Sequence, residues 1–116
     1  MRKITKKASD AFWSFKNMSN SNTRIEHEKD DEENVIRSKV FLFNNLIIWR
    51  DFFTPDGQNC DIVKINFRGW NTPTTRERVN GILNNVLVDN FVQRNFGLWW
   101  GWTPIDPSET NEVVIF

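Results

Sequence analysis

The chain has 116 residues, of which 39% are hydrophobic, so it can build the core of one small domain. Its 15 basic and 15 acidic residues cancel, and it therefore lacks the overall positive charge that drives non-specific binding to nucleic acids. A single cysteine excludes an internal disulfide and a multi-cysteine zinc site, and no run of about 20 apolar residues could span a membrane. The low cysteine content fits a reducing compartment. We expect no signal peptide, because no apolar run follows the basic N-terminus.

The N-terminal segment has the periodicity of an amphipathic helix over residues 4–16, with Thr5 as the expected N-cap. The apolar residues that share one face of this helix are Ile4, Ala8, Ala11 or Phe12, and Phe15. Short polar residues at 17–22 end the helix, and residues 22–28 are compatible with a short strand. The charged run KDDEEN that follows indicates a solvated loop.

Residues 38–52 predict a β-hairpin, in which two apolar runs meet at Asn44–Asn45, because Asn tolerates the positive φ of a two-residue turn. A second turn, TPDGQN, leads into residues 61–68, which alternate with a period of two. The expected inward residues are Val63, Ile65 and Phe67, and the expected outward residues are Lys64, Asn66 and Arg68. This pattern is typical of an antiparallel sheet with one face exposed to solvent.

The stretch GWNTPTTRERVNG at 69–81 predicts a corner followed by a helix that begins at Thr74 or Thr75 and runs to about Leu83. Its apolar face would consist of Val79, Ile82 and Leu83. Further strands are expected in VLVDNFVQ and LWWGW, on either side of Gly97. The tail contains two prolines and ends in EVVIF, which we expect to form a terminal strand.

The sequence contains no constellation that predicts catalysis. His27 lies among acidic residues that could bind a divalent cation, but a flexible acidic loop explains them as well. Cys60 is far in sequence from that histidine and has no evident activating base. The carboxylates of the predicted sheet have no spacing that suggests an acid/base pair, and the glycines form no phosphate-binding loop. We therefore expect no enzyme activity, no metal and no cofactor.

Two groups of residues are candidates for binding. The first is Arg68, Trp70, Arg76 and Arg78, in which arginines could pair with an anion and the indole could stack. The simpler interpretation, which we favour, is that Trp70 is buried at the corner and the threonines only cap the helix. The second group is Trp99, Trp100 and Trp102, which a strand cannot bury on one face, so one ring is expected at a partner surface.

The segment GWNTPTTRERVNGI, together with MRKITKKASDAF, SNTRIE and the hairpin around NNLII, resembles a family of small, uncharacterised tailed-bacteriophage proteins. The positions that carry the resemblance in that segment are Gly69, Trp70, Thr72, Thr74, Thr75, Arg78 and Asn80. Val79 stands where the family usually has Leu, and Asn44 stands where its hairpin often has Gly. The resemblance covers residues 1–83, and loosely the strand to Trp102, but not the tail. It implies a phage origin and no known chemistry.

We predict an α+β fold with an N-terminal helix, a mostly antiparallel sheet of about five strands and a second helix near 74–83. Residues 1–102 would form a single domain, and 103–116 an extension with an edge strand. The expected function is that of a non-enzymatic phage accessory protein, in the host cytoplasm or the virion, that binds a host factor, a virion neighbour or a second copy of itself. The alternative is a nucleic-acid-binding module that uses Trp70 with the basic residues Lys3, Lys6, Lys7, Arg68, Arg76 and Arg78.

Overall fold

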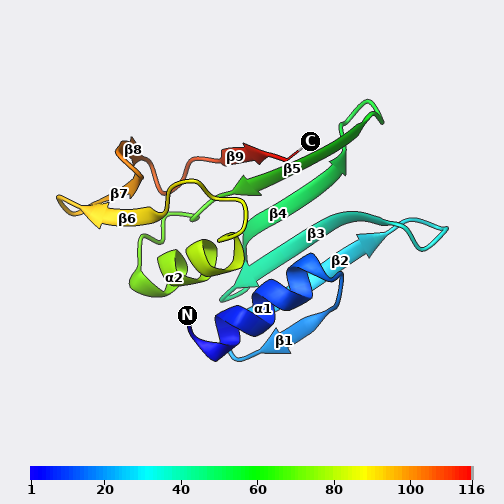
Figure 1. Ribbon diagram of the computed structural model, residues 1–116, viewed down its shortest axis with the longest axis horizontal. Coiled ribbons are helices and arrows are strands. Elements are labelled where there is room, and N and C mark those ends of the chain that lie inside the picture. The colour runs from blue at the N-terminus through cyan, green and yellow to red at the C-terminus, as the bar shows by residue number, and fades with distance from the viewer. Residues whose placement is uncertain (116) are drawn as a thin grey trace.

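The computed structural model, which describes residues 1–115, has two helices and nine strands in two antiparallel sheets (Figure 1). The helices are α1 (Lys3–Trp13) and α2 (Pro73–Ile82). The larger sheet has the order β1-β2-β3-β4-β5-β9, with bounds β1 (Met18–Asn20), β2 (Thr23–Lys29), β3 (Val35–Leu42), β4 (Asn45–Phe53), β5 (Asn59–Ile65) and β9 (Asn111–Val114). The smaller sheet has the order β6-β7-β8, with bounds β6 (Phe91–Arg94), β7 (Gly97–Trp100) and β8 (Thr103–Ile105). The predicted α+β class is confirmed, with more strands than expected and in two sheets.

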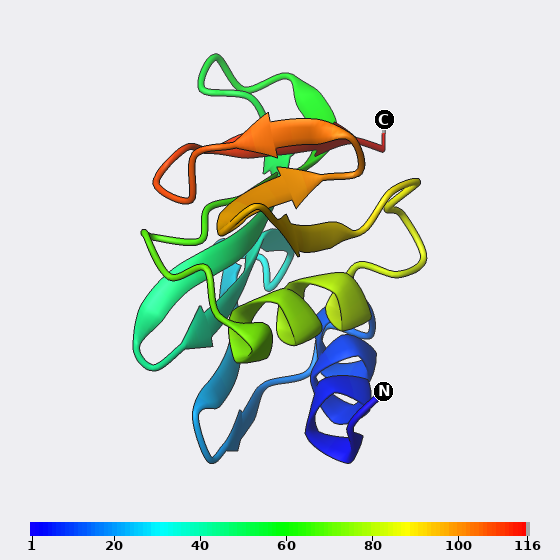
Figure 2. The ribbon, with the colours of Figure 1, turned by 90° about the vertical axis from the view of Figure 1, so that its left-hand side faces the viewer.

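One hydrophobic core joins both helices and both sheets. Figure 2 shows α2 lying between α1 and the three-stranded sheet. The core residues, all fully or almost fully buried, include Ala8, Phe12, Ile25, Val40, Ile48, Val63, Ile65, Val79, Ile82, Phe91 and Leu98. The alternation expected for β5 holds for Val63 and Ile65, and Phe67 is also buried just after the strand. Asn66 is buried as well, because its side-chain amide donates to Ser108 O and Thr110 Oγ1 in the segment before β9.

The alternate positions of the larger sheet carry charged side chains in pairs. The ion pairs between these residues are Arg24–Glu26, Arg37–Asp51, Lys39–Glu28 and Lys64–Asp51. This face is the solvated side of the antiparallel sheet that the sequence predicts, and such partly exposed pairs contribute little to stability. Neither helix among the described residues is long and apolar enough to cross a lipid bilayer.

Several predicted boundaries are wrong by a few residues. The β3–β4 turn consists of Phe43 and Asn44, with φ of 49° and 64°, because Asn45 already pairs with Leu42 as the first residue of β4. Thr5 does not cap α1 but is buried inside it, and the N-cap is Arg2, which makes no side-chain cap bond. Phe15 lies beyond the end of α1 and is 43% exposed. Residues 86–90 are not a strand, and β6 begins at Phe91.

The predicted terminal strand is confirmed as β9, which pairs with β5 and forms one edge of the larger sheet. The pairing matches Val113 with Val63 and Val114 with Ile62. The last residue of the predicted strand, Phe116, lies outside the described residues. The segment from Thr103 onward therefore supplies one strand to each sheet, β8 to the smaller and β9 to the larger.

Helix α2 begins two residues earlier than expected. Its N-cap is Thr72, whose Oγ1 accepts a hydrogen bond from the Thr75 N–H at 3.1 Å, and Pro73 occupies the first helical position, where its missing N–H costs nothing. We expect Thr72→Ala to lower the free energy of unfolding by about 1 kcal/mol, because the Thr75 N–H loses its acceptor. Thr74→Ala should change it by less than about 0.5 kcal/mol. Urea unfolding of the two variants distinguishes them, and an equal loss in both would contradict this helix start.

Candidate partner-binding groove

Two aromatic side chains stand exposed where the β3–β4 turn approaches the corner between β5 and α2. Phe43 is at the tip of the turn and exposes 62% of its surface. Trp70 follows Gly69, whose φ of 83° lets the chain reverse so that the Trp70 N–H donates to Phe67 O at 2.9 Å. The expectation that Trp70 is buried is wrong, since 58% of its surface is exposed. The backbone forms the predicted corner, but the Trp70 ring does not stabilise this corner by packing into the core.

These two rings border an apolar groove of about 530 Å³. Its floor consists of buried residues of the core, Leu42, Ile47 and Phe67. Its far wall is the start of α2, where it is lined by Thr72, Thr74 and Thr75. Asn45 completes the lining, so no titratable side chain faces this space. We call this feature the Trp70 groove. Among the described residues it offers apolar surface and a few threonine hydroxyl groups.

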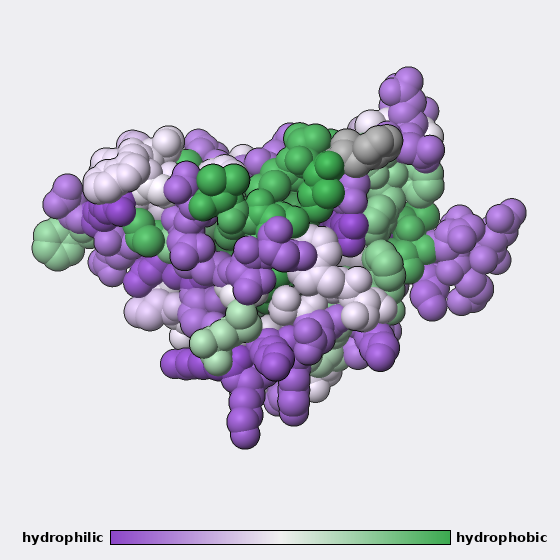
Figure 3. Space-filling model, viewed as in Figure 1, coloured by the Kyte–Doolittle hydropathy of each residue, from purple (hydrophilic) through white to green (hydrophobic). Residues whose placement is uncertain are grey.

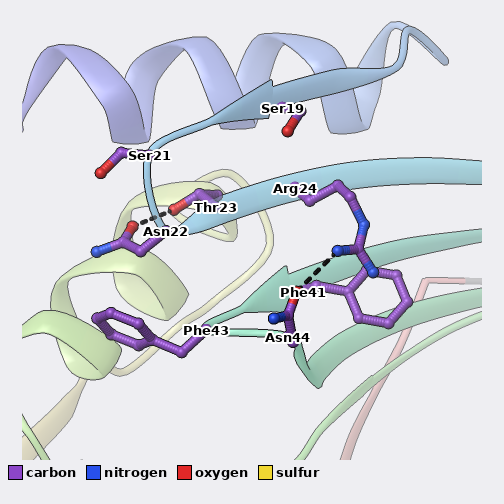
Figure 4. Close-up of a pocket in the computed structure, with 8 residues that line it drawn as sticks. All are labelled: Ser19, Ser21, Asn22, Thr23, Arg24, Phe41, Phe43 and Asn44. Atoms are coloured by element: carbon purple, nitrogen blue, oxygen red, sulfur yellow. Dashed lines mark hydrogen bonds between the residues drawn. The ribbon is translucent and has the colours of Figure 1, made fainter.

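A second, polar hollow of about 460 Å³ adjoins the groove at Phe43 (Figure 4). It lies between the β1–β2 turn and the β3–β4 turn, and two pairs of its polar side chains bond to one another. The Arg24 guanidinium stacks on the Phe41 ring, 4.2 Å from its centroid, and donates to Asn44 Oδ1 at 3.0 Å. Thr23 Oγ1 donates to Asn22 Oδ1 at 2.8 Å. The Arg24–Asn44 bond and the hydrogen bond from the Phe43 N–H to Asn22 O, at 2.9 Å, link the two turns beside Phe43.

The three candidate arginines do not form one patch. Arg78 is 2% exposed and donates to Thr23 Oγ1 at 3.1 Å, to Thr5 Oγ1 at 3.0 Å and to Glu77, so a partner cannot reach it. Arg68 folds back on β4, where Nε donates to Leu46 O at 2.8 Å and the guanidinium lies 5.4 Å from the Trp49 ring centroid. Arg76 bonds to Asn71 and reaches Gln93. The sequence places these residues together, and the structure turns them in different directions.

Residues 1–114 match the protein family described as Kyanoviridae Gp96 protein. The chain belongs to this phage protein family. The resemblance to small tailed-phage proteins is thereby confirmed, and the match extends beyond the residues that carry the resemblance, through β9. No curated protein and no solved structure matches the chain.

In this Gp96-family chain the three candidate tryptophans of the C-terminal part differ in exposure. Trp100 stacks on Phe91, with centroids 5.0 Å apart, and its indole N–H donates to Asp89 O at 2.9 Å. Trp99 is half-buried and donates to Arg94 O. Trp102 lies in the turn after β7 and is 81% exposed, with the Arg94 guanidinium 4.0 Å above its ring. Trp102 is therefore the exposed ring that the sequence predicts here, although it lies outside β7.

The remaining reactive side chains of the Gp96-family chain have structural surroundings. His27 points to the end of α1, where its ring nitrogens meet Ser38 Oγ at 2.7 Å and Lys16 O at 3.0 Å. Asp30 accepts from the N–H groups of Glu32 and Asn34 in its own turn. Partial burial, with the nearby Asp51 and Asp61 carboxylates, raises the pKa of the Cys60 thiol, so it is protonated at neutral pH. Within residues 1–115 no three His, Cys, Asp or Glu side chains are grouped to hold a metal.

The sequence analysis did not predict that two phenylalanines are exposed in turns. Phe43 and Phe96 each occupy a two-residue hairpin turn with positive φ, 49° and 63°, in the neighbouring letters FN and NF. Such turns favour Asn and Gly, which adopt these angles with little strain. Both phenylalanines lie next to an Asn between two runs of strand-forming residues. This pattern indicates a two-residue turn, and it would have predicted that both rings are exposed.

Proposed function

We propose that this chain is a non-enzymatic phage accessory protein that binds another protein, a host factor or a virion neighbour, through the Trp70 groove. The observation that carries this proposal is Phe43. Its left-handed backbone costs a residue with a Cβ roughly 1 kcal/mol, and its 62% exposed ring recovers little of that by burial. Phe43 lowers the stability of its turn in the free protein, and contact of its ring with a partner in a complex would explain why a phenylalanine occupies this position.

The chemistry of the groove supports a protein partner. Large aromatic residues beside an apolar floor are what the centres of protein interfaces contain, and Trp is enriched among the residues that dominate binding energy. The groove would accept an aliphatic or aromatic side chain of the partner between Phe43 and Trp70. The absence of titratable side chains from its lining supports a binding role over catalysis.

The dispersal of the arginines weakens the case for the nucleic-acid alternative. Single-strand binding needs a basic track along which bases stack on aromatic rings. Here Arg78 is buried and Arg68 lies over Trp49, so neither stands beside the Trp70 ring as a free cation. With zero net charge, the chain has no general attraction for phosphate to replace them.

We expect Trp70→Ala to weaken partner binding by about 30-fold or more, corresponding to about 2 kcal/mol for a central aromatic residue. Because the ring is mostly exposed, the variant should keep its thermal stability. The partner is captured from infected cells with the wild-type chain, and its affinity is then measured for both chains. Trp102→Ala is the matched control, since Trp102 is also exposed but lies outside the groove.

Capture that survives Trp70→Ala, or is lost equally in Trp102→Ala, would contradict the proposal. Binding of single-stranded DNA that falls steeply with added salt would favour the nucleic-acid alternative instead.

Phe43 gives a second test, because its effects on stability and on binding should have opposite signs. We expect Phe43→Asn to raise the free energy of unfolding by roughly 0.5–1 kcal/mol, since Asn suits the left-handed turn, while it weakens binding to the partner. Phe96→Asn, which replaces the exposed second residue of the β6–β7 turn, also of positive φ, should stabilise similarly and leave binding unchanged. Chemical unfolding and affinity measurements on both variants decide it, and loss of stability in Phe43→Asn would refute the argument from strain.

A further inference from the structure

The described chain has four edge strands, and three of them are protected against pairing with another strand. In the smaller sheet, β8 contains Pro104, which lacks an N–H donor. On the other side of that sheet, the Asn80 amide bonds to both backbone groups of Phe91 in β6, each at 2.8 Å. In the larger sheet, β1 has only three residues. Short strands, prolines and covering side chains are the devices by which proteins prevent association through sheet edges.

The fourth edge, β9, is one residue longer than β1, has no proline and no side chain bonded to its backbone, and presents free backbone groups. The Ile115 N–H donates to Asp61 O of β5 at 2.8 Å, and Val113 pairs with Val63 in the same alternation. Because the hydrogen-bonding direction alternates along a strand, Glu112 and Val114 direct their N–H and C=O groups away from β5. Val114 also exposes 67% of its surface, and Ile115 exposes 40%. Figure 3 shows the hydrophobic surface in the region of β9.

We propose that β9 pairs with β9 of a second copy of this chain, antiparallel and about a twofold axis at Val113. In that register Glu112 lies opposite Val114 of the second copy and Val114 opposite its Glu112, which forms four backbone hydrogen bonds between outward-facing groups. Val113 lies opposite its symmetry mate on one face of the joined sheet, and Val114 projects from the other face beside Glu112 of the second copy. The two larger sheets become one continuous sheet with a self-complementary contact.

The charges favour a second copy over an arbitrary strand. Glu112 is the single charged residue of β9, and this register places it opposite a valine and not opposite the other Glu112. Its neighbour on β5 is Lys64, a residue of opposite charge that lies opposite Glu112 in the register of the sheet. The strand therefore contains the pattern that its own antiparallel copy requires.

The contact is small, so the dimer should be weak. Four backbone hydrogen bonds and the cross-strand side-chain contacts of one short strand fall well below a standard interface, and we expect a dissociation constant on the order of 10–100 μM. Sedimentation of the wild-type chain between about 5 and 500 μM should show the average mass rising from that of one chain toward that of two. A chain that stays monomeric at the highest concentration would overturn the proposal.

Val114→Pro is the decisive variant. Proline is tolerated on an edge strand where the N–H faces solvent, so the pairing with β5 is kept while the outward donor is lost. We expect association at least tenfold weaker, with thermal unfolding at 5 μM close to that of the wild type. Val114→Thr keeps the N–H and should associate within about threefold of the wild type. Association of Val114→Pro equal to the wild type would overturn the proposal.

Amide hydrogen exchange of the wild-type chain keeps the proposal testable if Val114→Pro fails to fold. Exchange at Glu112 and Val114 should slow as concentration rises, whereas Val113 should be protected already at low concentration, because its N–H faces β5. Exchange at Glu112 and Val114 that is independent of concentration would contradict the pairing. Protection there only when another phage or host protein is added would assign the edge to that partner and would also overturn the proposal.

Discussion

Replacement of Arg78 with Ala is expected to cost about 3–5 kcal/mol of the free energy of unfolding, the largest effect that we foresee for a single side chain of this protein. Arg78 joins three elements, since it donates to Thr5 of α1 and Thr23 of β2 and pairs with Glu77 beside it on α2. Truncation removes a side chain that is 2% exposed and leaves these acceptors without their common donor. Urea unfolding measures the loss.

Two further variants separate the buried network from the charge alone. Arg76→Ala removes the same charge from the same helix at a half-buried position and should cost less than about 1 kcal/mol. Arg78→Met fills most of the volume without the charge and should lie between the two, because a buried ion pair can be replaced by packed apolar atoms at low cost. An Arg78→Ala variant no less stable than Arg76→Ala would contradict the role that we assign to Arg78.

Gly81→Ala is expected to destabilise the protein by about 1–3 kcal/mol, although Ala has a higher helix propensity than Gly. A Cβ at Gly81 would collide with Thr5 Cγ2, and Thr5 is fully buried where α1 crosses α2. The close approach of the helices therefore depends on the missing side chain at position 81.

A double-mutant cycle tests the origin of this cost. Thr5→Ser deletes the Cγ2 methyl group that would collide and retains the hydroxyl that bonds to Arg78 and Glu77. The double variant Thr5→Ser/Gly81→Ala should lose at least about 1 kcal/mol less free energy of unfolding than the sum of the losses in the two single variants. Strict additivity in thermal or urea unfolding would show that the two positions do not collide.

Local patterns predicted the parts of the fold that depend on local chemistry. The period of two in β5 placed Val63 and Ile65 in the core, and the helical period of α2 placed Val79 and Ile82 there. The terminal strand was predictable as well, since an apolar run after prolines needs cover. What these residues pair with was not readable, because β9 joins β5 across some fifty residues of sequence.

The site was less predictable, for reasons that lie in tertiary contacts. Arg78 looked exposed in the sequence because an arginine in a helix usually is, and the threonines that bury it lie 73 and 55 residues away. Trp70 looked like core because of its size, yet its ring stands at the exposed rim of a groove whose floor is Phe67 and residues of the β3–β4 hairpin. The turn lies at Phe43–Asn44, one residue before the predicted Asn44–Asn45, and this shift places a phenylalanine in the turn. The sequence of the turn alone does not determine the shift, because the register depends on how the two strands pair.

Site-specific photocrosslinking in infected cells tests the proposed partner binding most directly. A photoreactive phenylalanine analogue replaces Phe43 at the rim of the Trp70 groove, or replaces Phe96, an even more exposed turn residue outside it. The proposed function predicts a discrete protein adduct from position 43 that is absent from position 96, is lost in the Trp70→Ala background and resists nuclease. Adducts of equal yield from both positions, or adducts at position 43 that nuclease removes, would contradict it.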